Sequence, residues 1–398
     1  MLSVTEAFSL VLKHPLVLPA ETIPLAQAAG RVLREPLVAD RDLPPFDRVS
    51  MDGIAIRYQS FASGQRHFRV AGAQFAGQPA QTLDDETACL EVMTGAMLPL
   101  ETDTVIRYED IQITEGVAEI RIETVLPGQN IHQRATDRKQ NDELASVGTR
   151  LGPPEMAVAA SVGKAMVLVS RLPRIALIST GDELVDVSET PEPYQIRRSN
   201  TYLLQTVLQT VGAQTALLHL PDDAGAMETE LKSLLNDYDA LVLSGGVSAG
   251  KADFVPGVME RLGVRQVFHQ VAQRPGKPLW FGASEAGKVV FGLPGNPVST
   301  FLCAYRYLLP WLNASLGLRL SQPTVARLSQ PVMFQPRLTY YLPVSLSISP
   351  DGSWLAEPLP GSGSADYANL LQCDGFMELP SEQSAFKAGE AFPVYTFR

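Results

Sequence analysis

The hydrophobic pattern at the start of the chain predicts an amphipathic helix. Apolar residues recur at helical spacing, at Val4, Ala7, Phe8, Val11 and Leu12, and Ser3 with Glu6 three positions later has the spacing of a capping box. The helix would present one apolar face, so we expect it to pack against a later part of the chain.

From residue 42 to residue 137 the pattern changes to short apolar runs, such as 68–70 and 104–106, separated by Gly and Pro. Helical periodicity is weak there, which predicts a small β-rich domain. Residues 151–170 return to a helical pattern ahead of and around Gly163.

After Pro173 the apolar segments alternate between the strand pattern and the helix pattern. Residues 175–178 read as a buried strand. One face of a following helix is lined by Leu203, Leu204, Val207, Leu208 and Val211 and ends at Gly212, with Ser199 or Asn200 able to cap that helix. Further strands at 215–220, 240–243 and 289–291 alternate with helices at 227–235 and 255–262. This alternation is typical of a doubly wound α/β sheet.

Beyond Gly317 the helical signal disappears. Strand-like segments at 341–348, 354–356 and 392–397, with a turn at 350–352, predict a small antiparallel module. The length of 398 residues agrees with two to four domains of ordinary size.

The composition narrows the class of partner. The formal net charge of -11 opposes binding to nucleic acid and to anionic membranes, so an anionic ligand must be captured by local donors. The N-terminus lacks the basic and apolar regions of a secretion signal, and no apolar run is long enough to cross a bilayer, which predicts a cytoplasmic protein. Cys89, Cys303 and Cys373 lack metal-site spacing and are expected to be buried free thiols.

Three loops at predicted strand ends carry the candidate chemistry. They span residues 179–183, 243–250 and 292–299 and are rich in Gly, Ser and Pro. Ligands of doubly wound sheets bind beyond the carboxyl ends of the strands, and glycine loops that enter helices offer free amide groups to a phosphate. None of the loops has the P-loop pattern or the dinucleotide fingerprint, so an ordinary nucleotide triphosphatase or nicotinamide enzyme has little support.

Carboxylates follow the same strand ends. Glu183, Asp222 or Asp223, and Asp253 would supply the hard oxygen ligands that a phosphate-bound magnesium ion needs. The alternative for each of them is helix capping or simple solvent exposure.

Two cations stand in a loop that prolines restrain. Arg274 and Lys277, in the segment 274–278, could hold a phosphate or another oxyanion. The alternative is a solvated surface loop.

Several motifs, in this order, resemble those of one family. They are Pro-Phe-Asp at 45–47 with Ser-Met-Asp-Gly at 50–53, Met-Thr-Gly-Ala at 93–96, Gly-Gln-Asn-Ile at 128–131 with Asp137, and the segments 179–183, 244–248, 275–278 and 292–299. The combination resembles the bacterial molybdopterin molybdenumtransferases and the C-terminal domain of gephyrin over nearly the whole chain, with a looser match at the C-terminal end.

The resemblance implies a multidomain α/β and β fold. Its four parts would be a discontinuous elongated domain at 1–41 and 138–172, a β-rich domain at 42–137, a doubly wound molybdopterin-binding domain at 173–316, and a C-terminal β-barrel at 317–398. It also implies a homodimer in which Asp52, Thr94 and Asp137 of one subunit face the doubly wound domain of the other.

By the same resemblance, the chain inserts molybdate into adenylylated molybdopterin and releases AMP, with Mg2+ as the divalent cation. A molybdopterin adenylyltransferase and recipient molybdoenzymes would be its partners. Four residues are implied in catalysis: Asp52, Asp137, Glu183 and Asp253. The implied metal ligands are Glu183, Asp222, Asp223 and Asp253. The implied substrate-binding residues are Thr94, Ser179, Thr180, Gly181, Ser199, Asn200, Gly245, Gly246, Ser248, Arg274, Lys277, Pro294, Pro297 and Ser364.

This chain also departs from the family pattern. An arginine pair of the family is replaced by His132 and Gln133, the first of two lysines by Arg274, and a C-terminal arginine by Leu342. Three alternatives stay open on the sequence: a molybdopterin adenylyltransferase, a pterin-binding paralogue without turnover, and a scaffold.

Overall fold

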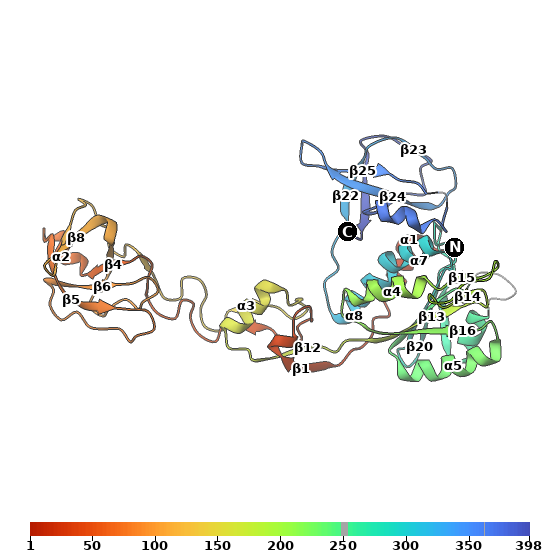
Figure 1. Ribbon diagram of the computed structural model, residues 1–398, viewed down its shortest axis with the longest axis horizontal. Helices are drawn as coiled ribbons and strands as arrows, with labels where there is room; N and C mark the ends of the chain where they lie inside the picture. Colours follow the sequence, from red (N-terminus) through yellow and green to blue (C-terminus); the bar gives the residue numbers. More distant parts are fainter. Residues whose placement is uncertain (248–253, 362) are drawn as a thin grey trace. The chain divides into compact units, whose positions relative to one another are not determined.

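The computed structural model describes residues 1–247, 254–361 and 363–398, which divide into two compact units (Figure 1). The larger unit comprises Met1–Glu35, Val147–Pro153 and Met166–Arg398. The smaller unit comprises Pro36–Ser146 and Pro154–Ala165. Among the described residues no helix combines the length and apolarity that a membrane crossing requires.

A six-stranded sheet forms the centre of the larger unit. Its strand order is β16-β13-β17-β21-β20-β18. The bounds are β13 (Arg174–Thr180), β16 (Gln214–Leu220), β17 (Ala240–Ser244), β18 (Val264–Phe268), β20 (Trp280–Ser284) and β21 (Val289–Leu293). The first four strands are parallel, whereas β20 runs antiparallel to both of its neighbours. The predicted doubly wound sheet is confirmed, but β18 and β20 were not foreseen.

Alternate side chains of the sheet enter two separate cores. Ile175 and Leu177 pack on one side with α1, α4, α7, η3 and α8, whereas Ala176 and Ile178 pack on the other with α5 and α6. The helices are α1 (Val4–Leu12), α4 (Asn200–Gln209), α5 (Ala224–Asp237), α6 (Val255–Arg261), α7 (Pro297–Cys303), η3 (Ala304–Leu308) and α8 (Leu309–Leu316). Both faces of the sheet are thus covered, which explains why its strands read as continuous apolar runs.

The predicted capping box of α1 is present. Ser3 Oγ accepts a hydrogen bond from the amide of Glu6 at 3.2 Å, and the Glu6 carboxylate accepts one from the amide of Ser3 at 2.9 Å. Helix α1 contacts η3 and α8, so it packs on a later part of the chain as expected. Its buried residues belong to the α/β core.

The helical pattern expected for residues 151–170 is only half right. Helix α3 (Pro153–Ser161) is present, but β12 (Met166–Ser170) is a strand that pairs with β1 (Ala20–Pro24). Val167 and Val169 are buried on one face of β12, and such β-branched alternation favours a strand.

A closed five-stranded barrel lies near the C-terminus. Its strands are β22 (Thr324–Leu328), β24 (Thr339–Ile348), β25 (Trp354–Pro358), β26 (Gly375–Leu379) and β28 (Ala391–Thr396). The ring closes because β24 pairs with both β25 and β26. The predicted C-terminal β-barrel is confirmed. Two further pieces are β19 (Gln273–Arg274), which pairs with β24, and η4 (Tyr367–Gln372).

The smaller unit is β-rich, as the sequence predicts. Its six-stranded sheet has the order β7-β4-β6-β5-β9-β8, with bounds β4 (Gly53–Ile56), β5 (His67–Gln74), β6 (Ala88–Val92), β7 (Thr104–Arg107), β8 (Ile111–Thr114) and β9 (Val117–Ile120). Two short pairs accompany it, β3 (Arg48–Val49) with β10 (Ile131–His132) and β2 (Leu37–Val38) with β11 (Glu143–Ala145). Helix α2 (Tyr58–Ala62) follows β4.

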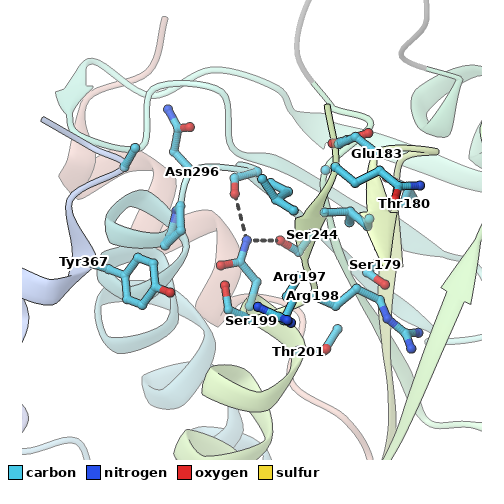
Figure 2. A pocket seen from close by; sticks show the side chains of 18 of the residues that line it. Ser179, Thr180, Glu183, Arg197, Arg198, Ser199, Thr201, Ser244, Asn296 and Tyr367 are labelled. Carbon is cyan, nitrogen blue, oxygen red and sulfur yellow. Dashed lines mark hydrogen bonds between the residues drawn. The ribbon is translucent and has the colours of Figure 1, made fainter. Parts of the chain in front are cut away.

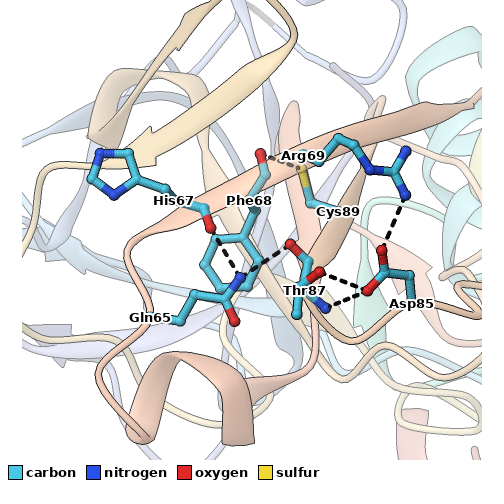
Figure 3. Close-up of polar contacts among 7 residues, drawn as sticks. All are labelled: Gln65, His67, Phe68, Arg69, Asp85, Thr87 and Cys89. Carbon is cyan, nitrogen blue, oxygen red and sulfur yellow. Dashed lines mark hydrogen bonds and ion pairs between the residues drawn. The ribbon is translucent and has the colours of Figure 1, made fainter.

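A polar cluster ties β5 to the segment before β6 (Figure 3). Asp85 accepts hydrogen bonds from the amide and hydroxyl of Thr87 and from Arg69, and these bonds lower the pKa of Asp85. Cys89 lies buried beside the cluster, and burial raises the pKa of its thiol to about 12. Cys303 and Cys373 are buried and free as well, so the prediction of three buried free thiols is confirmed.

Candidate functional site

A cavity of about 700 Å³ opens beyond the carboxyl ends of β13, β17 and β21 (Figure 2). We call it the strand-end cavity. Its lining residues are Ser179, Thr180, Glu183, Leu184, Pro191, Gln195, Ile196, Arg197, Arg198, Ser199, Asn200, Thr201, Ser244, Gly245, Gly295, Asn296, Pro297, Ala365 and Tyr367. The structure therefore brings together residues from all three predicted loops, as the position of the loops at neighbouring strand ends requires.

Gly245 lets two of these loops approach each other, and Gly181 turns the chain within the first loop. Gly245 has φ +100°, and a Cβ there would lie 2.8 Å from the carbonyl oxygen of Thr180. Gly181 has φ +131°, and a Cβ there would lie 2.5 Å from the carboxylate of Glu183. A side chain at Gly245 would clash with the Thr180 backbone as well as strain its own, whereas at Gly181 the strain remains but the Glu183 carboxylate can move aside. Gly246, also predicted, packs against Thr180 but does not line the cavity.

Asn200 is the first residue of α4, and its side chain connects this helix to the loops after β17 and β21. Its amide nitrogen donates hydrogen bonds to Ser244 Oγ and to the carbonyl oxygen of Gly295, both at 2.8 Å (Figure 2). Ser199 precedes it as the N-cap residue, but the Ser199 side chain makes no capping hydrogen bond. The hydroxyl of Ser199 is therefore not used to cap the helix and stands at the cavity wall.

Two arginines of the cavity wall were missed by the sequence reasoning. Arg197, in β15 (Ile196–Arg197), donates to the carbonyl oxygen of Glu189 at 3.0 Å, and Arg198 forms an ion pair with Asp186. An Arg-Arg pair directly before a helix start was the available signal, because a cation there can reinforce the anion binding of the helix N-terminus.

The predicted metal ligands do not converge among the residues that the structure describes. Glu183 is exposed and lines the cavity. Asp223 instead caps α5, since its Oδ1 accepts a hydrogen bond from the amide of Ala226 at 2.7 Å. For this residue, helix capping, the alternative to metal binding, is therefore what the structure shows. The amide of Asp222 donates to Asp182 at 3.2 Å. Within residues 1–247, 254–361 and 363–398 no three His, Cys, Asp or Glu side chains form a metal cluster. Asp253 and Ser248 lie outside the described residues.

The predicted cations, Arg274 and Lys277, line a second, smaller cavity of about 340 Å³. We call it the barrel-side cavity. Its lining residues are Gln273, Arg274, Pro275, Gly276, Lys277, Pro278, Asn296, Val298, Ser299, Leu338, Tyr340, Tyr341, Pro343, Gly361, Gly363 and Ser364. Arg274 enters it because β19 pairs with β24 of the barrel. Asn296 lines both cavities and donates to Ser364 Oγ at 2.8 Å.

Of the two predicted prolines, one lines a cavity. Pro297 is the first residue of α7 and lies at the strand-end cavity. Pro294 lines neither cavity; its carbonyl oxygen accepts a hydrogen bond from Ser244 Oγ at 3.4 Å.

In the smaller unit, Asp52 and Thr94 are in direct contact. Asp52 Oδ1 accepts hydrogen bonds from the amide of Thr94 at 2.6 Å and from its hydroxyl at 2.8 Å. These bonds, the backbone one first, lower the pKa of the Asp52 carboxyl. The carboxylate is thereby held ionised and in one orientation.

Asp137 is held by one of the residues that depart from the family pattern. His132 Nε2 lies 3.0 Å from Asp137 Oδ1, and Arg48 lies 3.0 Å from His132 Nδ1. Because Arg48 can only donate, the neutral ring carries its proton on Nε2 and donates to Asp137. Leu342, another of the departures, is buried in the barrel core.

The fold and the cavities define a class: a multidomain protein with a doubly wound domain that carries a cavity at its strand ends, a β-rich unit and a β-barrel. Family comparisons agree with this class. Residues 2–163 match the "MoeA N-terminal region (domain I and II)", residues 176–314 the "Probable molybdopterin binding domain", and residues 325–397 the "MoeA C-terminal region (domain IV)".

Relatives and a solved structure cover the whole chain. A protein of Synechocystis sp. named molybdopterin molybdenumtransferase is 42% identical over 400 residues, covering 100% of both chains. One of that name from Haemophilus influenzae is 30% identical, covering 100% of this chain and 99% of its own. The crystal structure of a molybdopterin biosynthesis moeA protein from Pyrococcus horikosii superposes with a TM-score of 0.84 at 30% identity, covering 100% and 99% of the two chains. The chain belongs to the molybdopterin molybdenumtransferase family.

Proposed function

We propose that this protein inserts molybdate into adenylylated molybdopterin and releases AMP during molybdenum cofactor biosynthesis. The observation that carries the proposal is the strand-end cavity, which joins a carboxylate, two arginines and glycine loops in a chain that its family relatives match from end to end. A molybdopterin adenylyltransferase would supply the substrate, and molybdoenzymes would receive the product. The matched regions on both sides of the α/β domain favour insertion over adenylylation.

The phosphates would lie at the polar side of the strand-end cavity. Arg197 and Arg198 supply positive charge there, and Ser179 with Thr180 supplies hydroxyl groups at the end of β13. Thr180 is 3% exposed, and its Oγ1 has no hydrogen-bond partner among the described residues. A buried hydroxyl without a partner costs about 1–3 kcal/mol, and a phosphate oxygen would accept its hydrogen bond.

Magnesium would reach this cavity together with the phosphates. Glu183 fits that requirement, because Mg2+ is commonly held by one or two carboxylates plus substrate oxygens rather than by a cluster of protein ligands. The bound ion would neutralise phosphate charge. Asp223 fits less well, since its carboxylate already caps α5. Asp222 and Asp253 stay candidate ligands.

Molybdate would bind in the barrel-side cavity. Arg274 and Lys277 offer two cations there, and Ser364 and Asn296 add uncharged polar groups at its wall. The cavity of about 340 Å³ has room for a small tetrahedral dianion, and its two cations suit the charge of that dianion. Asn296 lines both cavities and would therefore lie between the bound molybdate and the pterin.

Asp52, Thr94 and Asp137 would act across a homodimer, orienting substrate or water at the doubly wound domain of the other subunit. Mixing two inactive variants tests this arrangement. Asp52→Ala and Glu183→Ala subunits, unfolded and reassembled together, should recover about a quarter of the wild-type rate, because half of the dimers are mixed and each holds one intact site. Recovery of no activity would argue that each site uses one subunit only.

The function itself is tested by AMP release. Purified protein given adenylylated molybdopterin, magnesium and molybdate should release AMP only when molybdate is present, and should deliver active cofactor to an apo-molybdoenzyme. Consumption of ATP with molybdopterin would indicate adenylylation instead. Tight pterin binding without AMP release would indicate a paralogue without turnover or a scaffold.

A further inference from the structure

We propose that the side-chain oxygen of Asn200 accepts a hydrogen bond from the exocyclic amino group of an aromatic heterocycle bound in the strand-end cavity. Adenine and the pterin both carry such a group. The inference rests on the proposed function, in which the substrate contains both rings, and it assigns to Asn200 the selection of an amino group over an oxo group.

The orientation of the Asn200 amide follows from its partners. The carbonyl oxygen of Gly295, 2.8 Å away, can only accept a hydrogen bond, so the atom that faces it must be the amide nitrogen. Ser244 Oγ accepts the second hydrogen of that nitrogen at 2.8 Å and lies 3.4 Å from the carbonyl oxygen of Pro294, to which it donates. A flipped amide would set two acceptors against each other, so the oxygen is held away from both loops.

The amide oxygen that remains is buried and has no donor among the described residues. Leaving such an acceptor without a partner costs about 1–3 kcal/mol, whereas an incoming N–H group would remove that cost. An oxo group or a phosphate oxygen at the same point would meet another acceptor and be repelled. Asn200 is therefore set to recognise a donor, which an anionic group cannot supply.

The apolar side of the cavity suits a flat ring. Tyr367 and Ile196 line it with 49% and 59% of their surface exposed, and Pro297 adds a further apolar face. Figure 2 shows Tyr367 on the side of Asn296, across the view from Glu183 and Thr180. Stacking of a heterocycle on Tyr367 would leave the phosphates at the polar side and bring the ring edge to the loop that holds Asn200.

Two matched ligand pairs test the proposal in equilibrium binding to the full chain. Pterin and lumazine differ by an amino group and an oxo group on the pteridine ring, and AMP and inosine monophosphate differ in the same way on the purine. The wild-type protein should bind the amino member of at least one pair about tenfold more tightly, equal to about 1.4 kcal/mol. The pair that shows the preference identifies which ring Asn200 reads.

Variants separate this role from simple support of the loops. Asn200→Ala should bring the affinity ratio of that pair close to one. Ser244→Ala, which leaves the Gly295 contact in place, should lower the ratio only in part. Asn236→Ala, on the exposed surface of α5, is the matched control and should keep the wild-type ratio. Tyr367→Leu should weaken both members of the pair equally, and Tyr367→Phe should restore their binding.

Equal affinities within both pairs for the wild-type protein would overturn the proposal, as would binding of none of the four ligands. An unchanged ratio in the Asn200→Ala variant, folded by its circular dichroism spectrum, would overturn it too. Molybdate-dependent AMP release by the wild-type protein under the same conditions would show that the failure concerns Asn200 and not the proposed function.

Discussion

The strand-end cavity and the barrel-side cavity both offer cations to an anion, but the chain builds them in different ways. The first is formed by loops that leave neighbouring parallel strands, and its arginines stand beside a carboxylate and several uncharged donors. The second is formed where β19 joins the barrel strand β24, and Arg274 and Lys277 line it with mainly apolar and small residues. The first therefore suits an extended ligand with several chemical parts, and the second a compact oxyanion.

Among the predicted variants, removing Glu183 should change the rate of AMP release most, because Glu183 lines the strand-end cavity. Glu183→Ala removes the one carboxylate that lines this cavity among the described residues, so AMP release should fall by at least about a hundredfold. The side chain is exposed, so the thermal unfolding midpoint should stay near that of the wild type. Glu230→Ala, an exposed change in α5, is the control. A Glu183→Ala enzyme with wild-type turnover would remove Glu183 from the mechanism.

Removing a cation from the barrel-side cavity should act on one substrate only. Lys277→Ala should raise the KM for molybdate about tenfold and change kcat much less, because the lysine would contribute binding rather than chemistry. Lys277→Arg should recover most of the affinity, and Lys232→Ala in α5 serves as the surface control. A raised KM for the pterin substrate with an unchanged KM for molybdate would reverse the assignment of the two cavities.

The loop of the barrel-side cavity should tolerate a methyl group poorly. Gly276 has φ +86°, and a Cβ would lie 2.7 Å from Gln273 Nε2 and 2.9 Å from Cys303 Sγ. Gly276→Ala should lower the free energy of unfolding by about 1–3 kcal/mol in urea titrations. Gly287→Ala is the matched control, because its φ is +78° and no atom lies within 4 Å of the added Cβ. Equal losses in the two variants would mean that strain alone, and not packing under the cavity, sets the cost.

The thiol below the same loop should be inert, which is the smallest effect expected. Burial raises the pKa of Cys303 to about 12, so the thiolate is scarce in the folded protein at pH 8 and appears only as the pH rises toward that value. Iodoacetamide should leave Cys303 unmodified at pH 8 until denaturant is added, as peptide mass spectrometry would reveal. Rapid labelling of Cys303 in the folded state would mean that the floor of the cavity opens readily.

The difference between the cavities also explains what the sequence could predict. The loops after β13, β17 and β21 were found because buried strand runs end in glycine and serine, and the carboxyl ends of parallel strands must meet. Gly245 and Asn200 accordingly line the strand-end cavity, whereas Gly181 does not. Which carboxylate faces the cavity did not follow, because strand-end position alone cannot separate the exposed Glu183 from Asp223, whose carboxylate caps a helix.

The barrel-side cavity was harder to foresee. The charges of Arg274 and Lys277 marked them in the sequence. Ser364 lines the same cavity but is distant in sequence, and its hydroxyl accepts a hydrogen bond from Asn296 that only the folded chain shows. Strands β18 and β20 were missed for a similar reason, since a short antiparallel pair at a sheet edge carries little periodicity. Arg197 and Arg198 were missed because their signal is their position just before a helix start, which a search for motif spacing does not detect.

We place the phosphates of the pterin substrate in the strand-end cavity and molybdate in the barrel-side cavity. Locating bound molybdate tests this division most directly. Crystals of the protein soaked in molybdate and measured at the molybdenum absorption edge should give an anomalous peak within hydrogen-bond distance of Lys277 and Arg274. A peak beside Arg197 and Arg198 in the strand-end cavity, with none at Lys277, would contradict the division.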